Sequence, residues 1–158
     1  MISNCLPVSV GASPTRLLSD KCTTLYQVRQ IHAYFIKTKL ISHALSVAKL
    51  VNVLSQSSVP YDAVYVFVHA LSGFRDIRGV EFLVPPTLKA CGKSWAFEEG
   101  KQIMGFILKT HLWNDPFVTN SLVRMCLELG MVELASFCSQ SSTKERVTFV
   151  QRNVEFRS

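Results

Sequence analysis

The stretch that decides the fold is LVPPTLKACGKSWAFEEGKQIMGFILKTHLWNDPFVTNSLVRMCLELGMVELA, residues 83–135. Its apolar residues recur every three or four positions, as at Phe97, Ile103 and Ile107. An α-helix brings such residues to one face, whereas a half-buried strand would alternate apolar and polar residues. Alternating stretches are scarce here, so the pattern predicts helices.

Proline and glycine mark where these helices begin and end. Asp115 followed by Pro116 is typical of an N-cap residue and a first helical position. Gly130 stands where a helix that begins at Pro116 would be expected to end. Pro85 and Pro86 open an earlier helix in the same way. The predicted helices cover residues 85–92, 97–110, 116–128 and 131–139.

The same pattern occurs earlier in the chain. QIHAYFIKTKL (30–40) and QIMGFILKTHL (102–112) align without a gap and share Q-I, K-T and the final leucine. At the same offset of 72 residues, Leu50 meets Leu122. Repeated helical units bury their apolar faces by stacking on their neighbours. We therefore predict an all-α protein, an α-solenoid of antiparallel helix pairs.

The composition fits a folded chain with an affinity for polyanions. Of 158 residues, 48% are apolar and 18% are charged, which suits one ordinary core or a short row of repeats. The net charge is +6, and no acidic residue lies between Asp20 and Asp62. A basic stretch of this kind favours nucleic acid, although a solvated helix face has the same composition.

Catalytic, metal and membrane functions find no support in the sequence. The five cysteines are odd in number and lack C-x-x-C spacing, and the four histidines never pair at ligand spacing. We expect no disulfide framework, no metal, no cofactor and no Cys/His nucleophile pair, and hence no enzyme. Cys91 and Cys126 lie among apolar residues and are expected to pack in the core. The most apolar run, residues 63–71, is too short to cross a bilayer.

Several words of the deciding stretch resemble a known family. LKAC (88–91), EEGKQI (98–103), DPFVTNSLV (115–123) and G-x-V-E-x-A (130–135) occur in the order found in land-plant pentatricopeptide repeat proteins. The resemblance is to the subclass that alternates long and short repeats, of which the chain looks like a short or truncated member. It implies the same α-solenoid that the helical period predicts.

The resemblance also implies repeat boundaries. They divide the chain into a transit peptide or disordered tail (1–20) and a degenerate repeat region (21–80). A long-type repeat (81–115), a short-type repeat (116–146) and an irregular tail (147–158) follow. The offset of 72 residues between the two copies is roughly one repeat shorter than the family's repeat lengths imply. We therefore expect a repeat to be missing near residues 71–80, which leaves apolar surface around residues 63–70 exposed or covered by packing foreign to the family.

Family members bind single-stranded RNA at about one base per repeat. The family's base-reading positions fall on Asn120 and Arg146 in the short repeat, and on Pro85 in the long repeat. An asparagine amide both donates and accepts hydrogen bonds, whereas proline reads nothing. Three basic side chains on the first helices are expected to contact RNA phosphates: Lys89, Lys93 and Arg124.

Four aromatic side chains could stack on bases. Aromatic residues on helix faces are more often core residues, and we expect this role for them: Phe97, Phe106, Trp113 and Phe117.

The resemblance implies a non-catalytic protein of organellar RNA processing or editing, in the mitochondrion or else the chloroplast. Its partners would be single-stranded organellar RNA and other RNA-processing proteins, without membrane insertion. Residues 1–19 are serine-rich, lack acids and carry one arginine, which fits a transit peptide loosely. Two other readings stay open, namely a protein-interaction solenoid and a truncated remnant without RNA function.

Overall fold

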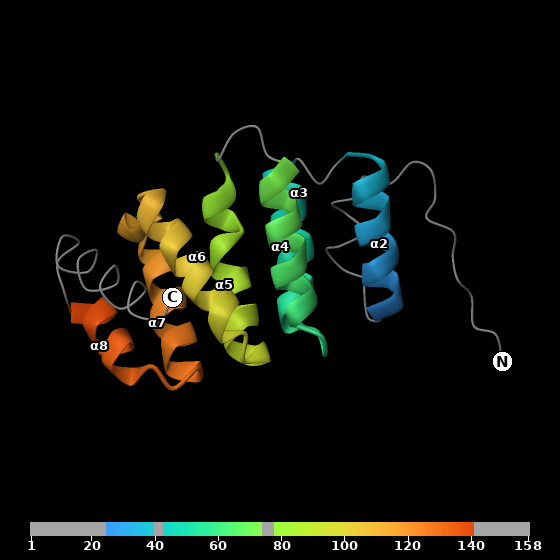
Figure 1. The fold of residues 1–158 in the computed structure, drawn as a ribbon. Helices are drawn as coiled ribbons and strands as arrows, with labels where there is room; N and C mark the ends of the chain where they lie inside the picture. Colours follow the sequence, from blue (N-terminus) through green and yellow to red (C-terminus); the bar gives the residue numbers. More distant parts are fainter. Residues whose placement is uncertain (1–24, 40–42, 74–77, 141–158) are drawn as a thin grey trace.

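The computed structural model describes residues 25–39, 43–73 and 78–140. All regular structure within these ranges is helical, without a strand (Figure 1). The elements are α2 (Leu25–Lys37), α3 (Ala44–Gln56), α4 (Tyr61–Gly73), η2 (Val80–Phe82), α5 (Val84–Ser94), α6 (Phe97–Lys109), η3 (Leu112–Asn114), α7 (Pro116–Glu128) and α8 (Val132–Gln140). The transit-peptide segment and the C-terminal tail proposed from the sequence lie outside the described residues.

The four helices predicted from local signals are present, with ends that differ by at most two residues. Asp115 caps α7, since its Oδ1 accepts hydrogen bonds from the backbone N–H groups of Phe117 (2.7 Å) and Val118 (3.3 Å). Gly130 follows α7 with a φ of 74°, a left-handed conformation that glycine adopts without strain. The cap signals therefore predicted α7 correctly.

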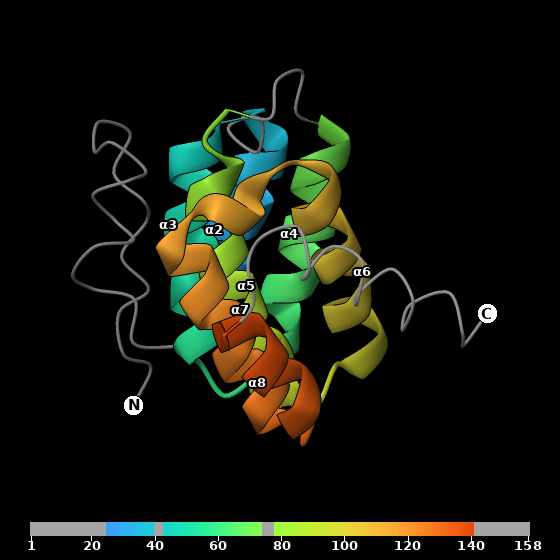
Figure 2. The same cartoon turned by 90° about the vertical axis from the view of Figure 1, so that its left-hand side faces the viewer.

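The helices stack as antiparallel pairs in two layers, which is the predicted α-solenoid. The pairs are α3 with α4, α5 with α6, and α7 with α8. In the first layer α3 packs on α5, and α5 packs on α7. Helices α2, α4, α6 and α8 form the second layer (Figures 1 and 2). Each first-layer helix therefore presents its outward surface on one face of the molecule, which we call the first-helix face.

One apolar core runs through both layers. Phe67 of α4 is buried and meets Phe106 of α6 edge to face, with ring centroids 6.1 Å apart. Trp113 is buried and Phe97 packs against the core, so the expected core role of three aromatic residues is confirmed. Phe117 is the exception, because 76% of its surface is exposed. Phe117 lies in the first turn of α7, two residues after the N-cap Asp115, and outside the side of α7 that is buried.

The 72-residue offset corresponds to two helix pairs, and the stack continues through the region where a repeat was expected to be missing. Helices α2 and α3 begin 72 residues before α6 and α7, respectively. Helix α5 lies between the copies and packs on α3, α4 and α7. The inner side of α4 is buried at Ala63, Val64, Val66, Phe67 and Ala70. Tyr65 and Val68 of the same helix are 63% and 54% exposed, so the expected exposed apolar surface around residues 63–70 is found in part.

The connection into α5 packs tightly on α3. Gly79 has a φ of 88°, and a Cβ atom built on it would lie 2.7 Å from the Cβ of Ala44. Its backbone N–H donates to the Glu81 carboxylate at 2.9 Å. Val80 is buried directly after it. A larger residue at this position would be strained by the positive φ and would clash with Ala44 at the start of α3.

Candidate nucleic-acid interface

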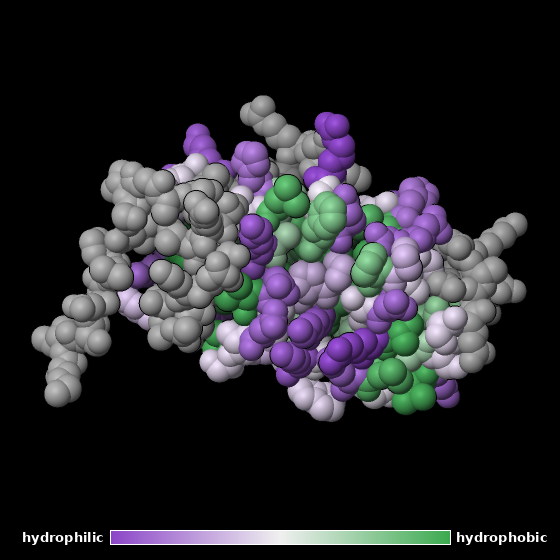
Figure 3. Space-filling view, turned by 180° about the vertical axis from the view of Figure 1, so that it is seen from behind, coloured by the Kyte–Doolittle hydropathy of each residue, from purple (hydrophilic) through white to green (hydrophobic). Residues whose placement is uncertain are grey.

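The first-helix face carries a hollow that spans three successive helices. Its volume is about 230 Å³. One residue comes from α3, three from α5 and two from α7: Asn52, Pro85, Pro86, Lys89, Ser121 and Arg124. Figure 3 looks onto this face, and hydrophilic residues gather across its middle.

Three residues of the hollow occupy equivalent places in the repeat. Asn52 and Arg124 are separated by the 72-residue repeat offset. Lys89 stands four residues after Pro85, as Arg124 stands four residues after Asn120. Each first-layer helix therefore contributes a polar side chain at this repeat position, and α7 adds Ser121. This alignment gives the hollow its composition, with one amide and two cations in a row.

The Nε side of the Arg124 guanidinium is hydrogen-bonded within α7. Its Nε donates to Glu128 Oε1 at 3.0 Å, an i,i+4 pair on α7, and the arginine side chain is 66% exposed. Arginine has five N–H donors, so four remain on the two Nη atoms. The carboxylate of Glu128 also lies against α5, because a Cβ atom built on Gly92 would overlap Glu128 Oε2. Gly92 thus makes room for the group that holds Arg124.

The structure brings together two of the five residues predicted to bind RNA. Lys89 and Arg124 both line the hollow. Asn120 is exposed on α7, one turn before Arg124, and Lys93 is exposed in the last turn of α5. Neither lines the hollow. Arg146 lies outside the described residues.

Asn52 and Ser121 are residues of the hollow that the sequence interpretation missed. A signal for Asn52 was available, because the repeat offset places it opposite Arg124. Ser121 has no such signal, since its place in the hollow depends on how closely α7 approaches α5. Pro85, which was expected to read no base, forms part of the wall instead.

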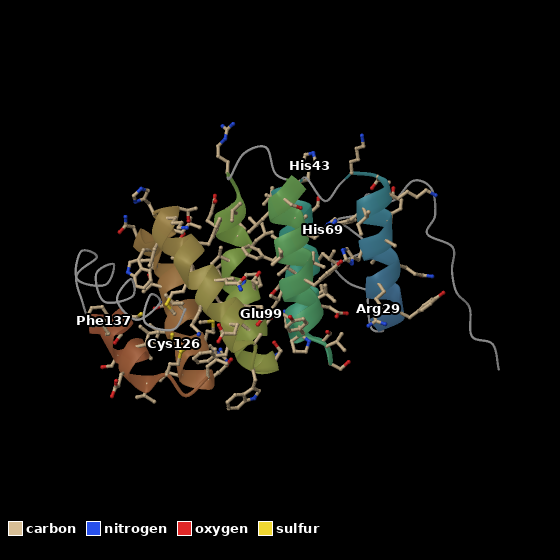
Figure 4. All side chains as sticks on the ribbon, in the orientation of Figure 1. Arg29, His43, His69, Glu99, Cys126 and Phe137 are labelled. Atoms are coloured by element: carbon tan, nitrogen blue, oxygen red, sulfur yellow. The ribbon has the colours of Figure 1, made fainter. Side chains whose placement is uncertain are left out.

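The buried cysteines are unsuited to nucleophilic chemistry. Burial raises the pKa of Cys91 to about 12, and burial raises the pKa of Cys126 to about 12 as well. Both thiols are therefore protonated near neutral pH. Figure 4 shows Cys126 inside the helix stack. The predicted packing role of both residues is confirmed by their complete burial.

Residues 25–39, 43–73 and 78–140 offer neither a metal site nor a membrane span. This part of the chain has no group of three or more metal-ligating side chains. None of its helices is long and apolar enough to cross a membrane.

Known proteins with similar sequences share one description. A chloroplastic pentatricopeptide repeat-containing protein of Arabidopsis thaliana is 24% identical over 152 residues, which cover 76% of this chain and 27% of the relative. Our chain is similar to pentatricopeptide repeat proteins. A second chloroplastic protein of this description, also from Arabidopsis thaliana, is 31% identical over 159 residues, 79% of this chain and 21% of the relative. A third, whose name gives no location, is 31% identical over 152 residues, 75% of this chain and 25% of the relative.

The chain spans about a quarter of the length of these pentatricopeptide repeat relatives. No family model matches the chain. No solved structure matches it either.

Proposed function

We propose that this chain is a pentatricopeptide repeat protein that binds single-stranded RNA on its first-helix face and catalyses no reaction. The observation that carries the proposal is the hollow, which Lys89 of α5 and Arg124 of α7 both line. No acidic residue is among those that line it. The similarity to pentatricopeptide repeat proteins gives this cationic hollow its RNA interpretation.

Asn120 and Lys93 lie on α7 and α5, the helices that also carry Arg124 and Lys89. Asn120 lies one turn before Arg124, where its amide could reach the edge of a base whose phosphate lies at Arg124. Lys93 would contact a further phosphate, and Arg146 would be the second base-reading residue of the short repeat. One amide supplies on the order of 1 to 3 kcal/mol of base discrimination, so we expect weak sequence preference.

We propose the organelle and the cellular process by analogy with the similar proteins. Two of the three relatives described above are named chloroplastic, which favours the chloroplast over the mitochondrion as the organelle. RNA processing or editing, together with other RNA-processing proteins, is the proposed role. Fusion of residues 1–19 to a fluorescent protein tests the location, and cytosolic fluorescence would contradict organelle import.

Fluorescence anisotropy with labelled oligonucleotides tests the function itself. We expect the chain to bind single-stranded RNA with an affinity that falls as salt rises, and to bind double-stranded RNA of the same sequence more weakly. Binding to a protein partner without any effect of RNA would instead support a protein-interaction solenoid. Absence of RNA binding at low salt would contradict the proposed function.

A further inference from the structure

The hollow between α3, α5 and α7 has the chemistry of a site for one nucleotide unit of an RNA backbone. Its charged groups are the Lys89 ammonium and the Arg124 guanidinium, and Asn52 and Ser121 add an amide and a hydroxyl. Cations beside neutral hydrogen-bonding groups, without an acid in the lining, select an anion that also has oxygen acceptors. A phosphodiester has both properties.

Its size argues against a separate small molecule. Pockets for whole ligands usually measure about 300 to 1,000 Å³, whereas this hollow holds about 230 Å³. At roughly 30 Å³ per water, that is the space of about seven or eight waters. A phosphate with its ribose fits such a space, while the base would extend outside it. The occupant is therefore one unit of a longer strand that continues along the face.

Pro85 and Pro86 favour a nucleotide over an inorganic anion as the occupant of the hollow. A helix start normally offers its N–H groups to anions, but Pro85 and Pro86 at the start of α5 have none. Anion binding at this point then rests on the two cationic side chains. The proline rings offer apolar C–H surface, which suits the ribose of a nucleotide better than an inorganic ion.

Arg124 is held in place for this contact. Glu128 accepts the hydrogen bond from its Nε and is itself seated against Gly92 of α5. The Nη edge of the guanidinium then carries the remaining donors, which bind two phosphate oxygens at once.

The geometry points to a seat for a single phosphodiester and its ribose at Asn52, Lys89 and Arg124, with Pro85 and Pro86 as the wall against the sugar. This inference rests on the proposed RNA-binding function and deepens it. The contact is independent of base identity, and it fixes where the strand crosses from α5 to α7. Asn120 then meets the base next to the seated phosphate.

The test measures how RNA affinity depends on salt for the full chain and three variants, with a short fluorescein-labelled single-stranded RNA. Lys89→Gln and Arg124→Gln each remove one cation of the seat. Lys109→Gln is the matched control, because Lys109 is an exposed lysine at the end of α6 in the second layer. Each phosphate contact on a single strand contributes about 0.7 to the slope of log K against log salt concentration.

Because both cations share one phosphodiester, we expect the slope to fall by at most about 0.7 in Lys89→Gln and by a similar amount in Arg124→Gln. It should stay unchanged in Lys109→Gln. A second RNA, with uncharged methylphosphonate linkages, should bind the unaltered chain and both seat variants alike. RNA binding with the same slope in all four proteins would overturn the seat and leave the proposed function standing. An equal fall in the control would also overturn it. Failure of the unaltered chain to bind RNA would reject the proposed function, and the seat with it.

Discussion

The contact between α5 and α7 in the middle of the stack, here called the central joint, and the contact between α2 and α4 at its N-terminal end, the end joint, are made by different interactions. Between α5 and α7 the contact is one of shape, with a glycine facing Glu128 and the α7 side chains Val118, Leu122 and Met125 fully buried. Between α2 and α4 the contact includes the exposed pair of Arg29 and Asp62, whose nitrogen and oxygen lie 3.5 Å apart. Close packing therefore underlies the proposed RNA face, while polar contacts help to join the end helix.

The polar end joint also contains a half-buried histidine. The Nε2 atom of His32 is buried and has no hydrogen-bond partner among the described residues. Burial lowers the pKa of His32, the nearby His69 lowers it further, and Asp62 raises it in part. Figure 4 shows His69 on α4 and Arg29 on α2, on the two sides of this joint. The lowered pKa of His32 is the basis for expecting that the contact between α2 and α4 depends on pH.

The largest expected effect comes from a cavity in the central joint. Leu122 is completely buried, so Leu122→Ala should lower the free energy of unfolding by about 2 to 5 kcal/mol. Urea denaturation followed by circular dichroism measures this. Leu127→Ala on the same helix is the control, because Leu127 is 54% exposed and its loss should change little. Equal effects of both substitutions would show that α7 does not pack as described.

Gly92→Ala should destabilise the same joint by a smaller amount. The added methyl group meets Glu128, and overpacking of this kind costs about 1 to 3 kcal/mol. Alanine gains up to about 1 kcal/mol of helix propensity over glycine, so a net loss of about 1 kcal/mol is expected. Gly105→Ala in α6 is the control, since no atom lies within 4 Å of the added methyl group. It should be neutral or stabilising, and a higher melting temperature for Gly92→Ala would contradict the close contact.

The end joint should weaken as the pH falls. Because the pKa of His32 is lowered in the folded chain, the unfolded chain binds more protons between the two pKa values. The stability that depends on neutral His32 is therefore full above the ordinary histidine pKa of about 6.5, and it is lost as the pH falls from there through the lower pKa of the folded chain. Hydrogen exchange in α2, measured from pH 8 to pH 5, should become faster relative to α7. His32→Gln should remove the difference, and an unchanged ratio in the unaltered chain would refute it.

The smallest effect is expected from the exposed ion pair. Arg29 and Asp62 are 64% and 38% exposed, and surface pairs of this kind contribute about 0 to 1 kcal/mol. Arg29→Gln should therefore shift the urea midpoint slightly, and only at low salt. A loss as large as that of Leu122→Ala would show that the end joint depends on this pair.

Local signals predicted the fold well, whereas contacts between distant residues escaped prediction. Helix α7 was predicted at its observed bounds because Asp115 and Pro116 act on their immediate neighbours. The continuous stack across the 72-residue offset was not predicted, since the packing of α5 on both α3 and α7 depends on contacts between residues far apart in the chain. Lys89 and Arg124 were predicted as RNA contacts, but the hollow that joins them could not be, because it exists only where three helices pack side by side.

RNA–protein cross-linking tests most directly whether RNA lies on the first-helix face. Single-stranded RNA that contains 4-thiouridine is irradiated with the chain, and the linked peptides are identified by mass spectrometry. We predict links within α5 and α7, near Lys89 and Arg124, and none within α4 or α6. Links concentrated on α4 and α6, with α5 and α7 unmodified, would contradict the assignment of RNA binding to the first-helix face.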